Sequence, residues 1–180
     1  EPGSLRLSEE RIVRQFTART TGLDWGSPQF IYVNLQAAHF PYSHPTMPLL
    51  TVNQPIQRSE INKENQAHLE ATYWNAITVA DQAVGAMLKR LMTLGVLNNT
   101  IVVIVSDHGE SLFDDGFLGH GHALNEIQTR IPLIIDQPGI EMHHAIGLVD
   151  IAELLVRLAT GRYEDSEFRD LNQPQLQYVG

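Results

Sequence analysis

Three short segments of this chain combine histidine with carboxylates, glycine or proline, and such combinations suit metal-ion and anion chemistry. Residues 106–110 read Ser-Asp-His-Gly-Glu, residues 119–122 read Gly-His-Gly-His, and residues 39–42 read His-Phe-Pro-Tyr. Carboxylate and imidazole together suit Zn²⁺ or Mn²⁺, and carboxylate also suits Ca²⁺ or Mg²⁺. These residue types predict a divalent-metal site and leave the ion open among Ca, Mn, Zn and Mg.

The pair Asp107-His108 comes one residue after an apolar run and allows two interpretations. Gly109 permits a sharp bend, so both side chains can turn toward one cation at the end of a strand. In the alternative, Asp107 caps a helix that begins near Gly109, and His108 is simply exposed. A position directly after a buried strand favours the metal site.

His120 and His39 are the other two candidates. Glycines on both sides of His120 let the backbone approach a ligand closely, although a flexible surface loop would have the same composition. His39 precedes a Phe-Pro pair, also after an apolar run. Segments at the ends of adjacent strands converge in a folded sheet, so the three segments together predict a shared site. His122 is a weaker candidate, and the remaining histidines, at 44, 68, 143 and 144, are not assigned to the site.

The elements that must position these residues follow from apolar periodicity and from glycine and proline. The pattern predicts helices at about 8–20, 63–94 and 149–159, buried strands at 30–35, 101–105 and 131–135, and a proline-rich surface loop from 37 to about 61. Alternating helices and strands predict an α/β fold with a mostly parallel sheet flanked by helices. Sites in such sheets lie beyond the carboxyl ends of the strands, where the three histidine segments fall.

Composition narrows the function. The 180 residues carry a formal charge of −9, with no basic stripe to neutralise phosphates, so nucleic acid is excluded as a partner. A small anionic substrate is still compatible, because a metal would meet its charge locally. The absence of cysteine excludes disulfides, thiolate metal sites and a cysteine nucleophile within this sequence. There is also no run of 18 apolar residues and no signal-peptide pattern at the start.

Several segments in one order resemble the sulfatase family of the alkaline phosphatase superfamily. The likeness covers about residues 30–161, and its motifs are the strand and histidine segment 30–42, the helix segment 73–81, the metal-strand segment 99–110, the Gly-His-Gly at 119–121, and the segments 130–133 and 148–151. Each motif alone is weak, and their combination is specific.

The resemblance implies metal-dependent cleavage of sulfate or phosphate esters in an alkaline-phosphatase-like domain. It implies that Asp107 and His108 ligate the divalent metal, and that His39 and His120 contact the anionic group or leaving oxygen of a small ester substrate. His120 is also a candidate general acid. The family's nucleophile motifs, Cys-x-Pro-x-Arg and Ser-x-Pro-x-Arg, are absent. Residues 1–180 are therefore expected to form the C-terminal portion of a catalytic domain that lacks its nucleophile-bearing N-terminal half.

Several consequences and alternatives accompany that expectation. The isolated chain is expected to be inactive and to self-associate, and its parent to be extracytoplasmic or anchored to a membrane by an N-terminal segment. One alternative is a phosphoethanolamine or glycerol-phosphate transferase of the same superfamily, which shares the Asp-His-Gly-Glu motif. Membrane spans in the parent would favour the transferase, and a Cys-x-Pro-x-Arg motif would favour the sulfatase. A third interpretation is a non-catalytic α/β module.

Overall fold

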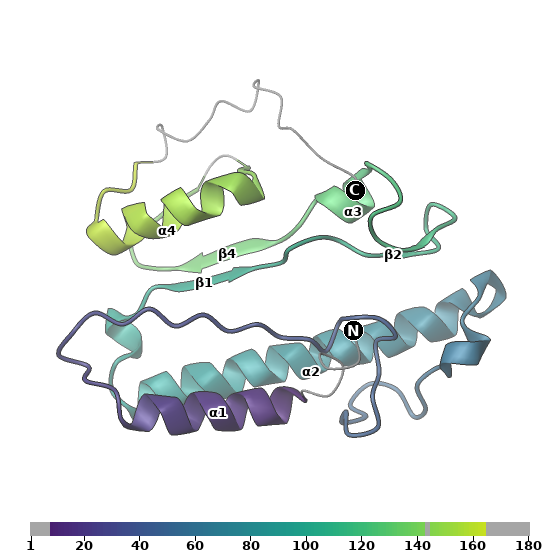
Figure 1. Ribbon diagram of the computed structural model, residues 1–180, viewed down its shortest axis with the longest axis horizontal. Coiled ribbons are helices and arrows are strands. Elements are labelled where there is room, and N and C mark those ends of the chain that lie inside the picture. Colours follow the sequence, from purple (N-terminus) through teal and green to yellow (C-terminus); the bar gives the residue numbers. More distant parts are fainter. Residues whose placement is uncertain (1–7, 143–144, 165–180) are drawn as a thin grey trace. The chain divides into compact units, whose positions relative to one another are not determined.

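The structure, a computed structural model, describes residues 8–142 and 145–164 (Figure 1). His143 and His144 lie outside the described residues, as does most of the polar tail. The chain divides into two compact units, residues 1–98 and residues 99–180, and each has a hydrophobic core of its own.

Two helices form the core of the first unit. Helix α1 (Glu9–Thr21) begins where the Ser8 hydroxyl accepts a hydrogen bond from the Arg11 amide, and helix α2 (Gln66–Thr93) lies alongside it (Figure 1). Their apolar faces meet in one cluster of buried side chains, Phe16, Ala83, Met87 and Leu91. Both helices predicted in this unit are confirmed, and Gly95, with φ of 73°, follows the end of the long one.

The predicted buried strand at residues 30–35 is wrong. No strand is assigned there, and Phe30 and Tyr32 are each 78% exposed, although Val33 and Leu35 contact the core of α1 and α2. A strand requires a neighbouring strand to accept and donate its backbone hydrogen bonds. The described part of this unit offers no such neighbour, so β-branched composition alone is insufficient.

The proline-rich segment is a loop, as predicted, as far as a 3-10 helix at Arg58–Glu60. It does not lie loosely on the surface, because buried side chains of α2 bind its backbone. The Asn75 side chain accepts from the Leu50 and Thr51 amides, at 2.7 and 3.0 Å, and donates to the Pro48 carbonyl. Such contacts satisfy backbone groups that irregular structure leaves unpaired.

The second unit contains a two-stranded sheet and a helix that covers one of its faces. Strand β1 (Val102–Val105) pairs with strand β4 (Leu133–Asp136), in a register that places Val105 opposite Leu133. Helix α4 (Ile151–Thr160) buries Leu154 and Leu158 against apolar side chains of these strands and ends at Gly161, with φ of 65°. The predicted strands and C-terminal helix exist, with boundaries shifted by one or two residues.

The predicted direction of the sheet is not confirmed. Strands β1 and β4 are antiparallel, as are the short strands β2 (Ser111–Leu112) and β3 (Leu118–Gly119), and no other strands occur in the described ranges. A parallel pair needs a crossover connection, usually a helix of several turns. Between β1 and β4 the only helix is α3 (Glu126–Thr129), so the chain simply turns back. An apolar run indicates burial of a strand, not its direction.

Helix length and hydropathy decide whether a helix could cross a membrane. Among the helices of the described ranges, none combines the length and the apolar character needed to cross a membrane.

Candidate metal and anion site

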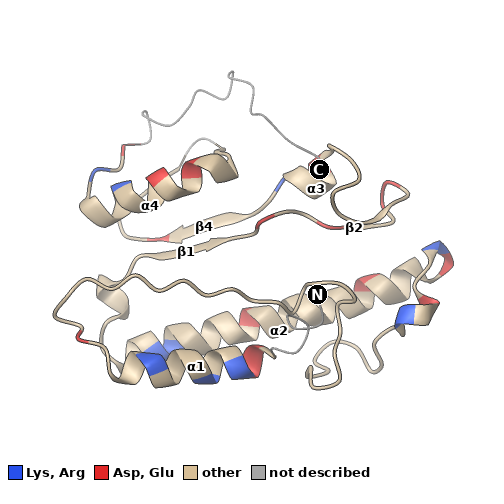
Figure 2. Cartoon of the chain, viewed as in Figure 1, with Lys and Arg blue, Asp and Glu red and all other residues tan. Residues whose placement is uncertain are grey.

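The candidate residues of the second unit lie on one excursion of the chain, residues 106–132, between β1 and β4. Strand β1 ends at Val105, so the Ser-Asp-His run at 106–108 directly follows it, as predicted. Residues 106–129 include five carboxylates and no Lys or Arg. Figure 2 shows these acidic positions on the chain beyond β1. A segment of this charge favours a cation, and an anionic substrate would approach it only when a cation is bound.

Gly109 fixes the course of the backbone at the centre of this segment. Its amide donates to the Gln128 carbonyl at 2.9 Å, and a Cβ atom at this position would lie 1.9 Å from the Ile127 carbonyl oxygen. Only glycine allows so close an approach of two backbone segments. The residues on either side, His108 and Glu110, are therefore held against helix α3.

Asp107 and His108 form a pair that fits a divalent cation. One Asp107 carboxylate oxygen accepts from the His108 amide at 3.1 Å, and the other lies 3.7 Å from His108 Nε2. Oxygen and nitrogen ligands bind one ion at about 2.1 Å each, so their atoms lie about 3–4 Å apart. The Asp107 side chain is 87% exposed and reachable by an ion. No helix begins near Gly109, so the helix-cap interpretation of Asp107 is wrong.

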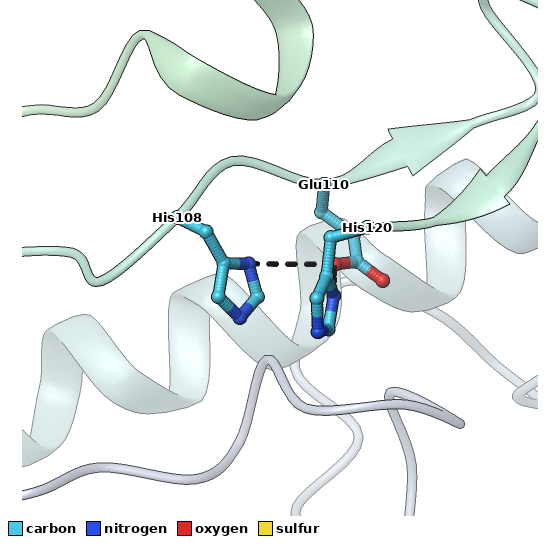
Figure 3. Close-up of side chains that lie close together, drawn as sticks. All are labelled: His108, Glu110 and His120. Carbon is cyan, nitrogen blue, oxygen red and sulfur yellow. Dashed lines mark hydrogen bonds and ion pairs between the residues drawn. The ribbon is translucent and has the colours of Figure 1, made fainter. Parts of the chain in front are cut away.

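His120 packs directly against His108. The two imidazole rings stack with centroids 3.6 Å apart and planes inclined by 28° (Figure 3). His120 Nδ1 lies 2.7 Å from a Glu110 carboxylate oxygen, and the Glu110 side chain is only 8% exposed. The structure thus brings two of the predicted histidines together. Glu110 also belongs to the cluster, although the sequence did not predict it as a site residue and it lies in the same Asp-His-Gly-Glu run.

A single ion shared by both rings is disfavoured, although His108, Glu110 and His120 offer ligand atoms within 4.8 Å of one another. His108 Nδ1 faces the Gly109 carbonyl oxygen at 2.8 Å, and His120 Nδ1 faces a Glu110 carboxylate oxygen at 2.7 Å. A ring nitrogen that donates its hydrogen to such an acceptor has no lone pair left for a metal ion. The arrangement suits a cation on Asp107 and His108 and a separate oxygen contact on His120.

His39 belongs to the first unit, so its approach to the other candidates stays a prediction. It is exposed at the start of a tight turn in which the Tyr42 amide donates to the His39 carbonyl at 2.8 Å. Tyr42 is fully buried and meets the ring of Tyr73 edge-to-face, with centroids 5.2 Å apart. Helix α2 thereby holds the turn that carries His39.

The loop that carries His120 is held in shape by Asp115. The carboxylate of Asp115 accepts from the Ser111 hydroxyl, from the Phe117 amide at 3.2 Å and from the Asn125 side chain. Asn125 in turn caps helix α3 by accepting from the Gln128 amide. The hydrogen bond from Ser111 holds the pKa of Asp115 below its usual value, while partial burial opposes this effect and the Phe117 and Asn125 contacts reinforce it.

We expect acid to loosen this loop. A carboxyl group whose pKa is lower in the folded state stabilises it fully above the ordinary value of 3.8, and that contribution is lost as pH falls through the folded pKa. As the pH falls below 3.8 and through the lower pKa of Asp115 in the folded state, the Phe117 amide should lose its hydrogen-bonded NMR shift. Asp115→Ala, which removes both carboxylate oxygens, should show the loosened signal already at neutral pH. An unchanged Phe117 signal in both cases would contradict this role of Asp115.

Comparison with known proteins identifies the class of this chain. Residues 8–160 match the family model described as Sulfatase. The chain therefore belongs to the sulfatase family of the alkaline phosphatase superfamily, whose domain has an α/β fold, acts on sulfate esters and generally uses a divalent metal such as Ca²⁺.

Individual relatives are sulfatases of bacteria and animals. The chain is 38% identical to an arylsulfatase of Clostridium perfringens over 79 residues, which cover 44% of the chain and 16% of that protein. It is 28% identical over 162 residues to an ulvan-active sulfatase of Formosa agariphila, and the match covers 82% of the chain and 32% of that protein. A homologue of extracellular sulfatase SULF-1 in Drosophila melanogaster is 30% identical over 127 residues, and the match covers 67% of the chain and 11% of that protein. The chain spans a third or less of these relatives, and no solved structure matches it.

Proposed function

We propose that this chain supplies the metal-binding C-terminal part of a sulfatase catalytic domain that cleaves sulfate esters, or phosphate esters, of a small anionic substrate. The observation that carries the proposal is the contact of His108 with His120 beside Asp107, at the end of β1. The surrounding acidic segment, residues 106–129, contains no Lys or Arg. This composition supports a bound cation as the group that attracts an anionic ester.

Each residue has a distinct role in this proposal. Asp107 and His108 hold the divalent cation, which when bound neutralises charge on the transferred group and helps to activate the nucleophile. His120 contacts the anionic group or the leaving oxygen through Nε2 and delivers a proton to the leaving group when the ring is protonated. His39 supplies a second contact to the same anion. These assignments follow the family resemblance, and the spacing of Asp107, His108 and His120 is compatible with them.

The nucleophile and further acidic ligands are proposed to come from the N-terminal half of the same domain, which would also add parallel strands to the sheet. Apolar side chains support this view, because Ile134 on β4 is 55% exposed. Where such side chains form a continuous patch, the patch marks contact with another protein segment. The chain alone would then self-associate through it. The extracellular relative supports an extracytoplasmic location for the parent, and membrane anchoring stays part of the proposal.

The test compares the parent protein with residues 1–180 alone. The parent should hydrolyse an aryl sulfate, lose activity in EDTA and regain it with a divalent metal. The isolated chain should stay at background, because no nucleophile accompanies its metal ligands. Turnover by the purified isolated chain that His108→Ala abolishes would contradict the assignment of the nucleophile to the other half.

The same assay separates the alternatives. Phosphate and sulfate chemistry place similar demands on Asp107, His108 and His120, so aryl phosphates and phosphoethanolamine donors are tested in parallel. Transfer of a head group without sulfate hydrolysis would establish the transferase instead. If the parent neither binds a divalent metal nor turns over any of these esters, the non-catalytic α/β module is the interpretation that remains.

A further inference from the structure

The three candidate histidines share a local feature. In each, Nδ1 faces an oxygen: the Phe40 carbonyl at 2.9 Å from His39, the Gly109 carbonyl at 2.8 Å from His108, and the Glu110 carboxylate at 2.7 Å from His120. A carbonyl or an ionised carboxylate only accepts hydrogen bonds. Nδ1 must therefore carry the hydrogen, and in a neutral ring Nε2 has a free lone pair.

Two of the described histidines outside the candidate site, His44 and His68, do not follow this pattern. His68 points Nε2 at the Gln54 carbonyl, at 2.8 Å, which fixes the opposite tautomer. His44 Nδ1 meets the Thr46 hydroxyl, which can donate or accept and fixes neither. A histidine that binds through Nε2 typically donates its other ring N–H to a carbonyl or carboxylate, which sets both tautomer and ring orientation.

The β2–β3 hairpin explains why a carboxylate meets His120. Its register pairs Ser111 with Gly119, so the next positions outward, Glu110 and His120, are opposite each other. Gly119 has φ of 87°, which glycine adopts without strain, and a Cβ atom there would lie 3.8 Å from a Glu110 carboxylate oxygen. The hairpin therefore brings the carboxylate and the imidazole together.

We propose that Glu110 is a positioning residue: its carboxylate holds His120 in the Nδ1–H form and directs Nε2 to the substrate side. In Figure 3 the Nε2 atoms of the stacked His108 and His120 rings lie at the same end, away from the Glu110 carboxylate. What Nε2 contacts rests on the proposed function, whereas the tautomer is a property of this chain alone.

Histidine ¹⁵N NMR of the chain tests this assignment at about pH 8.5, two units above the ordinary histidine value. In the wild type, His120 should show a protonated Nδ1 and an unprotonated Nε2. Glu110→Met should move His120 toward the Nε2–H form. His108 should keep the Nδ1–H form, because its acceptor is the Gly109 carbonyl. Glu110→Gln, whose amide oxygen still accepts, should preserve the wild-type pattern.

Two results would overturn the proposal: an Nε2–H form of His120 in the wild type, or an unchanged tautomer in folded Glu110→Met. If Glu110→Met does not fold, the wild-type spectrum still shows which tautomer His120 adopts. Glu110→Ala then replaces Glu110→Met as the variant in which a change of tautomer is expected. The measurement needs neither metal nor substrate. An inactive parent with the expected tautomer would therefore count against the proposed function and not against the role of Glu110.

Discussion

Replacement of Gly109 by alanine should disrupt the candidate site and destabilise the second unit by about 1–3 kcal/mol or more. The added Cβ would lie 1.9 Å from the Ile127 carbonyl oxygen, 3.0 Å from its carbon and 3.2 Å from Gln128 Cα. All three atoms belong to the backbone, so no rotamer change relieves the clash. Separation of the segments would also break the hydrogen bond from the Gly109 amide to Gln128. Urea denaturation followed by circular dichroism measures the loss.

Gly85→Ala is the matched control for this experiment. Gly85 is exposed within helix α2, and a Cβ atom there would meet no atom within 4 Å. Alanine is favoured over glycine in a helix interior by roughly 0.5–1 kcal/mol, so this variant should be as stable as the wild type or more so. If Gly109→Ala denatures at the same urea concentration as the wild type, the close approach to α3 does not constrain the site.

His108→Ala in the parent protein should reduce metal affinity and kcat/KM by more than about 100-fold. Loss of an outer-shell partner of a metal ligand typically costs about 10–100-fold, and this change removes a proposed ligand itself. It also leaves Asp107 without the imidazole that lies 3.7 Å from its carboxylate. Metal content by plasma mass spectrometry and steady-state hydrolysis of an aryl sulfate measure the two effects.

His122→Ala serves as the control, because His122 is exposed and its ring stacks on Phe117 rather than on the His108 and His120 pair. It should retain metal content and turnover within about twofold, as expected of a surface substitution. A His108→Ala parent that keeps its full metal content and rate would remove the metal role from Asp107 and His108. Equal losses in both variants would point to a general effect of changing the loop.

The helices could be predicted from sequence because their determinants are local. Ser8 caps α1, the apolar residues of α2 recur at helical spacing, and Gly161 ends α4 in the left-handed conformation. The strands depend on distant partners. Residues 30–35 have strand composition without a partner in the described part of their unit, and β4 lies antiparallel to β1 where a parallel sheet was predicted.

The candidate site, like the fold, contains residues that could be placed from the sequence and residues that could not. Asp107 and His108 could be placed at the end of a strand from the apolar run before them, and the contact of His120 with His108 agrees with the predicted convergence. Glu110 was missed because its partner is set by the register of a two-residue hairpin, which no periodicity reveals. The place of His39 depends on how the two units meet and stays a prediction.

The excursion between β1 and β4, residues 106–132, can change in length without changing the sheet that carries it. It leaves the sheet at Val105 and returns at Leu133, and these two residues are opposite each other in the ladder. The distance between its ends is therefore fixed by the sheet, whatever the length between them. Doubling a flexible loop costs only about 0.6 kcal/mol of closure entropy. Changes in the length of this excursion could thus alter the surroundings of the candidate site while the ladder and α4 stay intact.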